Sequence, residues 1–458
     1  MANEKNWRGS LTASDRYDNI QNITKWSAAT GLTGSAFEIE NEAYKASSSR
    51  EEYDAACNRQ DSRLGDGGGD GGPPPMQPEG SSNTDTEDND ALASSPGITI
   101  GEYHNCHYIA SGVTAQVYRA QARALKVIIE THNIEPHDPH REIKILNILH
   151  ASKAPNIITL LETFHDPYTQ NLVLVFPYAP ITLADLFAKY QQRQQVLSTS
   201  LIRTITTALF RALDHLHSVE SIIHRDIKPA ALLLTHPNPE SPSQILLSDF
   251  GTAWHPTLSP TMGGEPHDHK VLDVGTGAYR APETLFGNRA YGPGVDLWAA
   301  GTTIAECIRT GRTGSSTKRN GGGEHSDSDN NAENEDMTAR GPTLFDSRPA
   351  HEDGNQLGLV LSIFRTLGTP TPETWPEAKG FRTPPFEMYR VFPGVVSQGA
   401  TEEGEGEEGG RGWAGLLPGA DADWRALVEG LLKYESGWRI TAKEALKLPC
   451  VKGVAGEG

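Results

Sequence analysis

The stretch HRDIKPAALLL, residues 224–234, places a histidine, an arginine, an aspartate and a lysine directly ahead of an apolar run. Two short motifs follow it, SDFG at 248–251 and YRAPE at 279–283, and the lysine-bearing run RALKVI at 123–128 precedes it. Each motif alone occurs by chance, but all of them in this order leave little room for coincidence. The four segments therefore form one functional signature.

The sequence around this stretch changes from strand-like to helical patterns. Short runs rich in β-branched and aromatic residues occupy 107–130 and 158–178, with the helical pattern PHREIKILNILHAS at 139–152 between them. In the segment 198–219, apolar residues recur along one helical face. These residues are Leu201, Ile205, Ala208, Leu209, Ala212 and Leu216. The pattern predicts an α+β fold with a small β-rich lobe that carries one key helix, and a larger α-helical lobe.

Composition sets the expected boundaries. Residues 1–97 are rich in Ser, Asn, Asp, Glu and Gly, and such a segment cannot bury enough apolar surface to offset its ordering entropy. We expect a disordered tail at 1–97, an N-terminal lobe at 98–179 and a C-terminal lobe at 180–450. Two low-complexity runs, about 311–341 and 397–412, are typical of disordered loop insertions.

Charge and cysteine content limit the classes of partner. The 458 residues carry a net charge of −19, which disfavours broad nucleic-acid or anionic-membrane binding. The four cysteines lie far apart, which argues against a zinc site or a disulfide framework. No apolar run approaches the length of a membrane span. We expect a soluble monomer of the nucleus and cytoplasm that binds neither nucleic acid nor membrane.

The motif set resembles that of the eukaryotic-type protein kinases over roughly 98–448, with HRDIKP, SDFG and YRAPE in the known order. The resemblance implies a bilobal protein kinase fold. It also implies transfer of the γ-phosphate of ATP to hydroxyl groups of a protein substrate, in a cleft between the lobes. The implied cofactors are ATP and Mg²⁺.

By the same resemblance, five charged residues have assigned roles. Lys126 matches the strand lysine that contacts the α- and β-phosphates, and Glu142 matches the helix carboxylate that pairs with it. Asp226 matches the catalytic base that orients the substrate hydroxyl, and Lys228 steadies the transferred phosphate. Asp249 matches the magnesium ligand, since a hard cation prefers carboxylate oxygen.

The phosphate-binding loop departs from the family pattern. Its segment IASGVTAQVY, 109–118, keeps only Gly112 of the usual glycines and has alanine at the outer positions. Alanine is tolerable where φ is negative, so we expect a stiffer loop with a looser fit to phosphate. The other residues expected to contact ATP are Ala110, Ser111, Val113, Val117, Phe176 (the gatekeeper), Pro177 and Ala179.

Ala231 stands where the family has an asparagine. That asparagine would give an oxygen to a second magnesium ion and a bond that braces the catalytic loop, and a methyl group does neither. Loss of one such partner typically lowers turnover by about 10²–10³, against total accelerations of about 10⁶ or more. We expect a weakened but active kinase. The alternative is a pseudokinase scaffold that binds partners with little or no phosphoryl transfer.

Three further residues resemble family positions that hold the fold together. Glu283 of YRAPE and Arg439 of GWRITAKEAL are expected to form a buried ion pair. Asp296 of DLWAAG is expected to anchor the backbone of the catalytic loop. We assign these residues no catalytic role.

Two segments, 275–301 and 357–381, resemble the cyclin-dependent kinase group, particularly in YRAPE and LGTPTPETWP. The sequence NIEPHDPH, 133–140, contains nothing like the cyclin-recognition sequence, and its prolines predict a helix start close to Pro139. We therefore expect that no cyclin is required.

The usual activating phosphorylation is also absent from its expected position. Counting back from Tyr279 places Val271 in the slot of the activating threonine. Thr276 remains in the activation segment, residues 252–283 between SDFG and the end of YRAPE, and is expected to contact Asp226 and Lys228. These features resemble the single-subunit fungal kinases that activate cyclin-dependent kinases by phosphorylating their activation loop, which makes a cyclin-dependent kinase a candidate substrate.

Overall fold

The computed structural model describes residues 19, 23, 43, 47, 49–57, 97–129, 134–236, 244–311, 343–347, 356–382, 384–386, 392 and 412–452. The chain divides into two compact units. The first comprises Met1–Ile134 with Glu162–Phe176, and the second comprises Glu135–Leu161 with Pro177–Gly458. The expected insertions lie outside the described residues except for Gly311 and Gly412, so their disorder stays a prediction.

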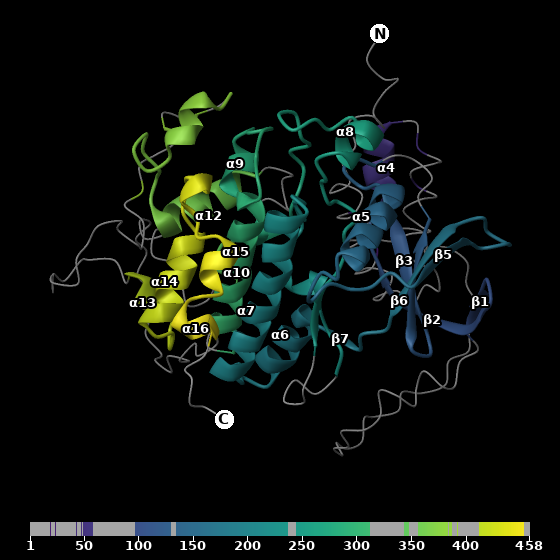
Figure 1. Ribbon diagram of the computed structural model, residues 1–458. Coiled ribbons are helices and arrows are strands. Elements are labelled where there is room, and N and C mark those ends of the chain that lie inside the picture. The colour runs from purple at the N-terminus through teal and green to yellow at the C-terminus, as the bar shows by residue number, and fades with distance from the viewer. Residues whose placement is uncertain are drawn as a thin grey trace, which may run out of the picture. The chain divides into compact units, whose positions relative to one another are not determined.

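The first unit is built on a six-stranded sheet, which confirms the β-rich part of the predicted α+β fold (Figure 1). In sheet order its strands are β1 (Ile98–Ile100), β2 (Tyr103–Ser111), β3 (Ala115–Ala120), β4 (Arg123–Ile128), β6 (Leu172–Pro177) and β5 (Glu162–His165). Antiparallel pairing joins β1 to β2, β2 to β3, β3 to β4 and β5 to β6. Side chains of one face form its core, among them Leu125 and Val127 of β4 and Val173 and Val175 of β6.

A short helix, α4 (Arg50–Cys57), lies inside the segment 1–97 that composition predicts to be disordered. Its residues Tyr53 and Cys57 are fully buried. The prediction of disorder does not describe this helix. Apart from α4 and a few single positions, the segment lies outside the described residues.

Helix α5 (Pro139–Ala151) begins where the sequence predicts. Asp138 is its N-cap and accepts a hydrogen bond from the backbone N–H of Arg141, while Pro139 takes the first helical position, where a missing N–H costs nothing. The fixed start places Arg141 and Glu142 in the first turn, and both side chains are buried.

The second unit is mainly helical, which confirms the other half of the predicted fold. Its larger helices besides α5 are α6 (Leu183–Gln192), α7 (Thr199–Asp214), α10 (Gly294–Arg309), α12 (Leu357–Leu367) and α14 (Ala422–Leu431). Every residue of α10 is buried, because α7 and α14 both pack against it (Figure 1). The predicted apolar face at 198–219 is buried along α7 and the π-helical turn that follows it. Across the described parts of both units, we find no helix with the length and apolar character needed to cross a membrane.

A three-stranded antiparallel sheet positions the two signature loops of the second unit. It contains β7 (Ile181–Thr182), β8 (Leu232–Leu234) and β9 (Ile245–Leu247), with β8 in the centre. The loop 224–231 runs into β8, and the loop 248–251 leaves β9. Because β8 and β9 pair directly, the two loops are adjacent.

The predicted ion pair between Glu283 and Arg439 is present and fully buried. Arg439 Nη1 and Nη2 donate to Glu283 Oε1 and Oε2 at 2.6 and 2.8 Å, in the bidentate geometry that arginine and carboxylate favour. Arg439 also donates to the carbonyl oxygens of Lys433, Gly294 and Tyr434. The pair thus ties the YRAPE segment to the C-terminal helices.

An aromatic cluster supports the same region. The Trp375 ring stacks on Tyr434 with 5.4 Å between centroids and meets Phe286 edge-on at 5.5 Å.

We predict that Trp375→Ala lowers the free energy of unfolding by about 3–5 kcal/mol, because it removes a fully buried indole and leaves a cavity. Chemical denaturation measures the change. Trp438→Ala is the control, since 57% of Trp438 is exposed, and an equal loss in both variants would contradict the packing argument.

Candidate functional site

Asp296 in α10 holds the start of the loop 224–231, the catalytic loop. Its carboxylate is 1% exposed and accepts hydrogen bonds from the backbone N–H groups of His224 and Arg225, both at 2.8 Å. His217 Nε2 lies 2.9 Å from Asp296 Oδ2. Burial alone would raise the pKa of Asp296. Its hydrogen bond to His217, its electrostatic interactions with His217 and His224, and the backbone hydrogen bond from Arg225 together lower it. The predicted backbone anchor is confirmed.

Two residues of the signature loops have backbone conformations that residues other than glycine rarely adopt. Arg225 has φ 72° and Asp249 has φ 64°, both in the left-handed region. Contacts between the loops keep them in place: His224 Nε2 lies 2.9 Å from the carbonyl oxygen of Ser248, and its ring meets Phe250 edge-on. Such strain persists only where surrounding structure over-determines it, and it concentrates at functional sites.

Asp226, Lys228 and Thr276 form a closed triangle of hydrogen bonds. Lys228 Nζ donates to Asp226 Oδ2 at 2.6 Å and to Thr276 Oγ1 at 2.9 Å. Thr276 Oγ1 donates to Asp226 Oδ1 at 2.7 Å. The contacts expected for Thr276 are therefore present, and a partly buried carboxylate is held beside an ammonium group and a hydroxyl.

Asp249 and Glu142 approach the same glycine. A β-carbon added to Gly251 would lie 3.4 Å from Glu142 Oε2 and 3.7 Å from Asp249 Oδ1. The backbone N–H of Asp138 donates to the carbonyl oxygen of Gly251 at 3.1 Å, which fixes the start of α5 against the SDFG loop. A methyl group at 251 would therefore lie in ordinary van der Waals contact with both carboxylates, which places Glu142 and Asp249 on the same side of this glycine.

The remaining predicted ATP contacts divide between the units. In the first unit, Lys126 of β4 pairs with Val117 of β3, and Val117 pairs with Ala110 of β2. The turn from Ser111 through Val113 is closed by the Gly112 N–H, which donates to Ala115 O at 2.8 Å. Lys126 is half-buried, between the buried residues Leu125 and Val127.

Three further predicted ATP contacts, Phe176, Pro177 and Ala179, lie at and just after the end of β6. Phe176, the predicted gatekeeper, is buried in β6 at the end of the first unit. Pro177 opens the second unit, and both Pro177 and Ala179 are half-buried. The contacts of all these residues with ATP stay predictions.

Ala231 is buried, with 1% of its surface exposed. Its carbonyl oxygen accepts hydrogen bonds from both the N–H and the hydroxyl of Ser248, each at 2.9 Å. Backbone atoms of residue 231 therefore join the two signature loops, and this connection requires no side-chain amide.

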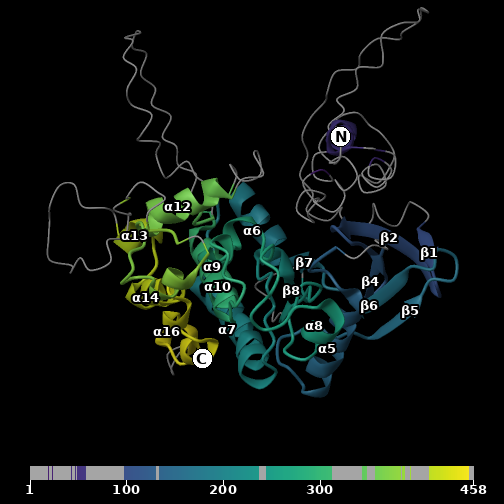
Figure 2. The ribbon, with the colours of Figure 1, turned by 90° about the horizontal axis from the view of Figure 1, so that it is seen from above.

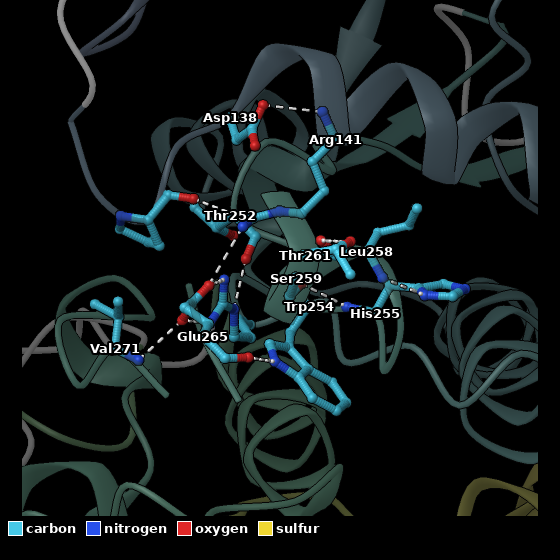
Figure 3. A network of polar contacts seen from close by, with 12 residues as sticks. Asp138, Arg141, Thr252, Trp254, His255, Leu258, Ser259, Thr261, Glu265 and Val271 are labelled. Carbon is cyan, nitrogen blue, oxygen red and sulfur yellow. Dashed lines mark hydrogen bonds and ion pairs between the residues drawn. The ribbon is translucent and has the colours of Figure 1, made fainter. Parts of the chain in front are cut away.

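One buried network escaped the sequence analysis. Glu265, in the segment after α8 (Leu258–Gly263), accepts two hydrogen bonds from Arg225, at 2.7 and 3.1 Å, and one from Arg141 Nη1 at 3.3 Å (Figure 3). The backbone N–H of Val271 donates to the same carboxylate at 2.9 Å. Glu265 stands in a short polar segment with no motif around it. The available signal was that each arginine directly precedes an expected functional carboxylate, Glu142 or Asp226.

Charge dominates this network. Burial alone would raise the pKa of Glu265, but the hydrogen bonds and charge of Arg225, the Val271 N–H and the charge of Arg141 lower it, so that Glu265 is a carboxylate. Lys270 is buried beside it, with Nζ 4.6 Å from the centroid of the Trp254 ring. Burial and the charge of Arg225 lower the pKa of Lys270 to about 8.

A second buried carboxylate lies beneath the YRAPE segment. Tyr279 donates to Glu306 Oε2 of α10 at 2.5 Å. Burial raises the pKa of Glu306 to about 7, although the hydrogen bond from Tyr279 and the charge of Arg309 act in the opposite direction. Glu306 is therefore partly protonated near neutral pH.

Comparison with known proteins extends these local observations to most of the chain. Residues 103–451 match the model of a family described as Protein kinase domain. Cyclin-dependent kinase 7 of Xenopus laevis is 29% identical over 357 residues, which cover 76% of this chain and 80% of that protein. The serine/threonine-protein kinase CAK1 of Saccharomyces cerevisiae is 28% identical over 303 residues, 60% of this chain and 75% of that protein. The serine/threonine-protein kinase csk1 of Schizosaccharomyces pombe is 26% identical over 332 residues, 72% of this chain and 88% of that protein.

We predict that the folded chain loses stability as pH rises from about 5 to 8 through Glu306. Its pKa is raised from 4.5 to about 7 on folding, so the folded state holds the proton that the unfolded state releases in this range. Glu306→Gln should remove this dependence and stabilise the chain at pH 8 by roughly 1–3 kcal/mol. Melting temperatures at pH 5.5 and 8 measure the effect. Glu429→Gln, at a half-exposed site on α14, is the matched control. A Glu306→Gln variant that melts below wild type at pH 8 would refute the assignment.

Proposed function

Because the chain belongs to the protein kinase domain family and is a Ser/Thr protein kinase, we propose that it activates cyclin-dependent kinases by phosphorylating a threonine in their activation segment. The observation that carries the proposal of an active enzyme is the triangle of Asp226, Lys228 and Thr276. A pseudokinase scaffold has no need to hold a carboxylate, an ammonium group and a hydroxyl in this arrangement.

Each member of the triangle has a proposed part in phosphoryl transfer. Asp226 Oδ1 and Oδ2 accept hydrogen bonds, so the carboxylate can accept one from an incoming hydroxyl and orient it for in-line attack. Lys228 stands beside that oxygen and offers positive charge to the phosphoryl group as it moves. Thr276 links both residues to the activation segment, which makes their geometry dependent on that segment.

The donor chemistry of the site fits magnesium and ATP. Magnesium is usually bound through one or two carboxylates together with substrate phosphates, and Asp249 offers such a hard oxygen ligand beside Gly251. ATP supplies the phosphoryl group, and magnesium neutralises charge on its phosphates. Lys126 is the residue of the first unit proposed to hold the α- and β-phosphates. The turn 111–114 is proposed to offer backbone N–H groups other than that of Gly112, which donates to Ala115 O.

The proposed substrate rests on resemblance. The motifs YRAPE and LGTPTPETWP are typical of the cyclin-dependent kinase group, and two of the relatives are fungal serine/threonine-protein kinases. Asp138 and Pro139 start α5 without a cyclin-recognition sequence, and Val271 stands in the usual slot for an activating phosphate. We propose that the enzyme works as a single chain, without a cyclin, in the nucleus and cytoplasm.

We predict that the purified chain alone transfers phosphate from ATP to the activation-segment threonine of a cyclin-dependent kinase, and that Asp249→Asn lowers the rate by at least about 10². The loss is expected because an amide is a weaker magnesium ligand than a carboxylate. Radiolabelled ATP and phosphosite mapping measure the transfer. The matched acceptor control carries alanine in place of that threonine.

Three outcomes would contradict the proposal. Equal background transfer by wild type and Asp249→Asn across a Ser/Thr peptide array would favour the pseudokinase. Transfer to peptides but to no cyclin-dependent kinase would contradict the proposed substrate, while the kinase activity itself would be confirmed. A many-fold gain on adding a cyclin would refute the single-chain mode of action.

We predict that Ala231→Asn raises turnover by about 10–100-fold or lowers the magnesium concentration needed for half-maximal rate. The amide oxygen would be a pre-placed ligand where the natural chain must recruit water. A magnesium titration of turnover measures the effect. Ala230→Asn adds the same amide one residue away, at an exposed position, and should change nothing. Unchanged magnesium dependence in a well-folded Ala231→Asn protein would show that position 231 does not limit catalysis.

A further inference from the structure

The carboxylate of Glu265 binds four donors from three segments that are far apart in the chain. Arg141 comes from α5, Arg225 from the catalytic loop and the N–H of Val271 from the activation segment itself. Arg141 and Glu265 are 124 residues apart in sequence, and Arg225 and Glu265 are 40 apart. Figures 1 and 2 both show α8, which immediately precedes Glu265, beside α5. Glu265 is therefore the point at which the three segments are joined.

The two arginines that it holds are direct neighbours of functional carboxylates. Arg225 precedes Asp226, and Arg141 precedes Glu142 in the first turn of α5. Arg225 has little freedom, since its backbone N–H is fixed by Asp296 and its Nη1 also donates to the Tyr291 hydroxyl at 3.2 Å. A change at Glu265 must therefore reach the catalytic loop and α5 together.

Glu265 is itself held from both sides. Its backbone N–H donates to Ser259 O at 3.2 Å, and its carbonyl oxygen accepts from Trp254 Nε1 at 3.0 Å. Only 4% of its surface is exposed. The carboxylate is thus placed in advance and excluded from water, where its attraction to the arginines is strong.

A gain in folding stability does not by itself explain why Glu265 is buried with two arginines. Removing two arginines and a carboxylate from water is energetically costly, and proteins in which a buried ion cluster is replaced by apolar residues are often as stable or more stable. Glu265 can instead position the site, because it joins the activation segment to Arg225 and Arg141. Phosphoryl transfer depends on the exact placement of charged groups.

We propose that Glu265 is a positioning residue that acts as a built-in substitute for an activating phosphate. A phosphorylated side chain in the activation segment would bring an acidic, multi-acceptor group to a pair of arginines. Glu265 supplies such a group permanently, and the backbone N–H of Val271 donates to it. The chain is therefore active as synthesised, and its activity is independent of phosphorylation of residues 252–283. This inference rests on kinase activity and not on the identity of the substrate.

The test compares wild type with Glu265→Gln, Glu265→Asp and Asp268→Asn, with the best acceptor from the peptide array. Glu265→Gln keeps shape and removes charge, so we expect kcat to fall by about 10–100-fold while KM for ATP stays within about twofold. Glu265→Asp keeps the charge on a shorter stem and should recover part of the loss. Asp268→Asn removes the same charge from an exposed position of the same segment and should match wild type. Circular dichroism and melting temperature establish the folded fraction of each protein.

A second arm needs no substitution. Wild-type chain treated with a broad-specificity phosphatase, and confirmed free of phosphate by mass spectrometry, should retain its kcat. Loss of activity in this arm overturns the proposal even if Glu265→Gln fails to fold. The proposal is also overturned if folded Glu265→Gln keeps kcat within about twofold of wild type, or if Asp268→Asn loses as much as Glu265→Gln.

Discussion

The carboxylate of Asp296 is the constraint on which the site depends. It lies in the fully buried helix α10 and accepts hydrogen bonds from the backbone N–H groups of His224 and Arg225, so the catalytic loop is fixed to a buried helix of the second unit. That attachment permits the positive φ of Arg225, and the ordering then extends through the loop to Asp226. A loop on its own could not hold this conformation, since an isolated residue would leave the left-handed region.

Charged groups in this chain are buried where segments must be joined. Glu265 connects α5 with two loops, Glu283 and Arg439 connect the YRAPE segment with the C-terminal helices, and Glu306 lies beneath Tyr279. Each of these carboxylates is satisfied by its neighbours, as buried polar groups must be. The protein therefore uses specific pairs, and not apolar contact alone, to hold the segment between 249 and 283.

The motifs and periodic patterns predicted much of this arrangement. The α+β fold, the start of α5 at Pro139, the anchor at Asp296, the pair of Glu283 with Arg439 and the contacts of Thr276 all follow from residues whose partners lie within known motifs. Glu265 could not be found in this way, because a single glutamate among Gly, Pro and His has no periodicity and its partners are distant in sequence. Helix α4 was missed for a related reason: its composition is polar, and only the fold shows that Tyr53 is buried.

The pairing of Glu283 with Arg439 also determines how much of the C-terminal region the fold requires. The two residues are 156 positions apart, and beyond them Arg203 and Thr207 of α7 donate to the carbonyl oxygens of Cys450 and Val451. A truncation before residue 439 would leave a buried carboxylate without its counter-charge, at a cost of about 3–5 kcal/mol. A frameshift or stop codon between residues 283 and 439 would thus disable the activation segment far upstream, although every catalytic motif would still be translated.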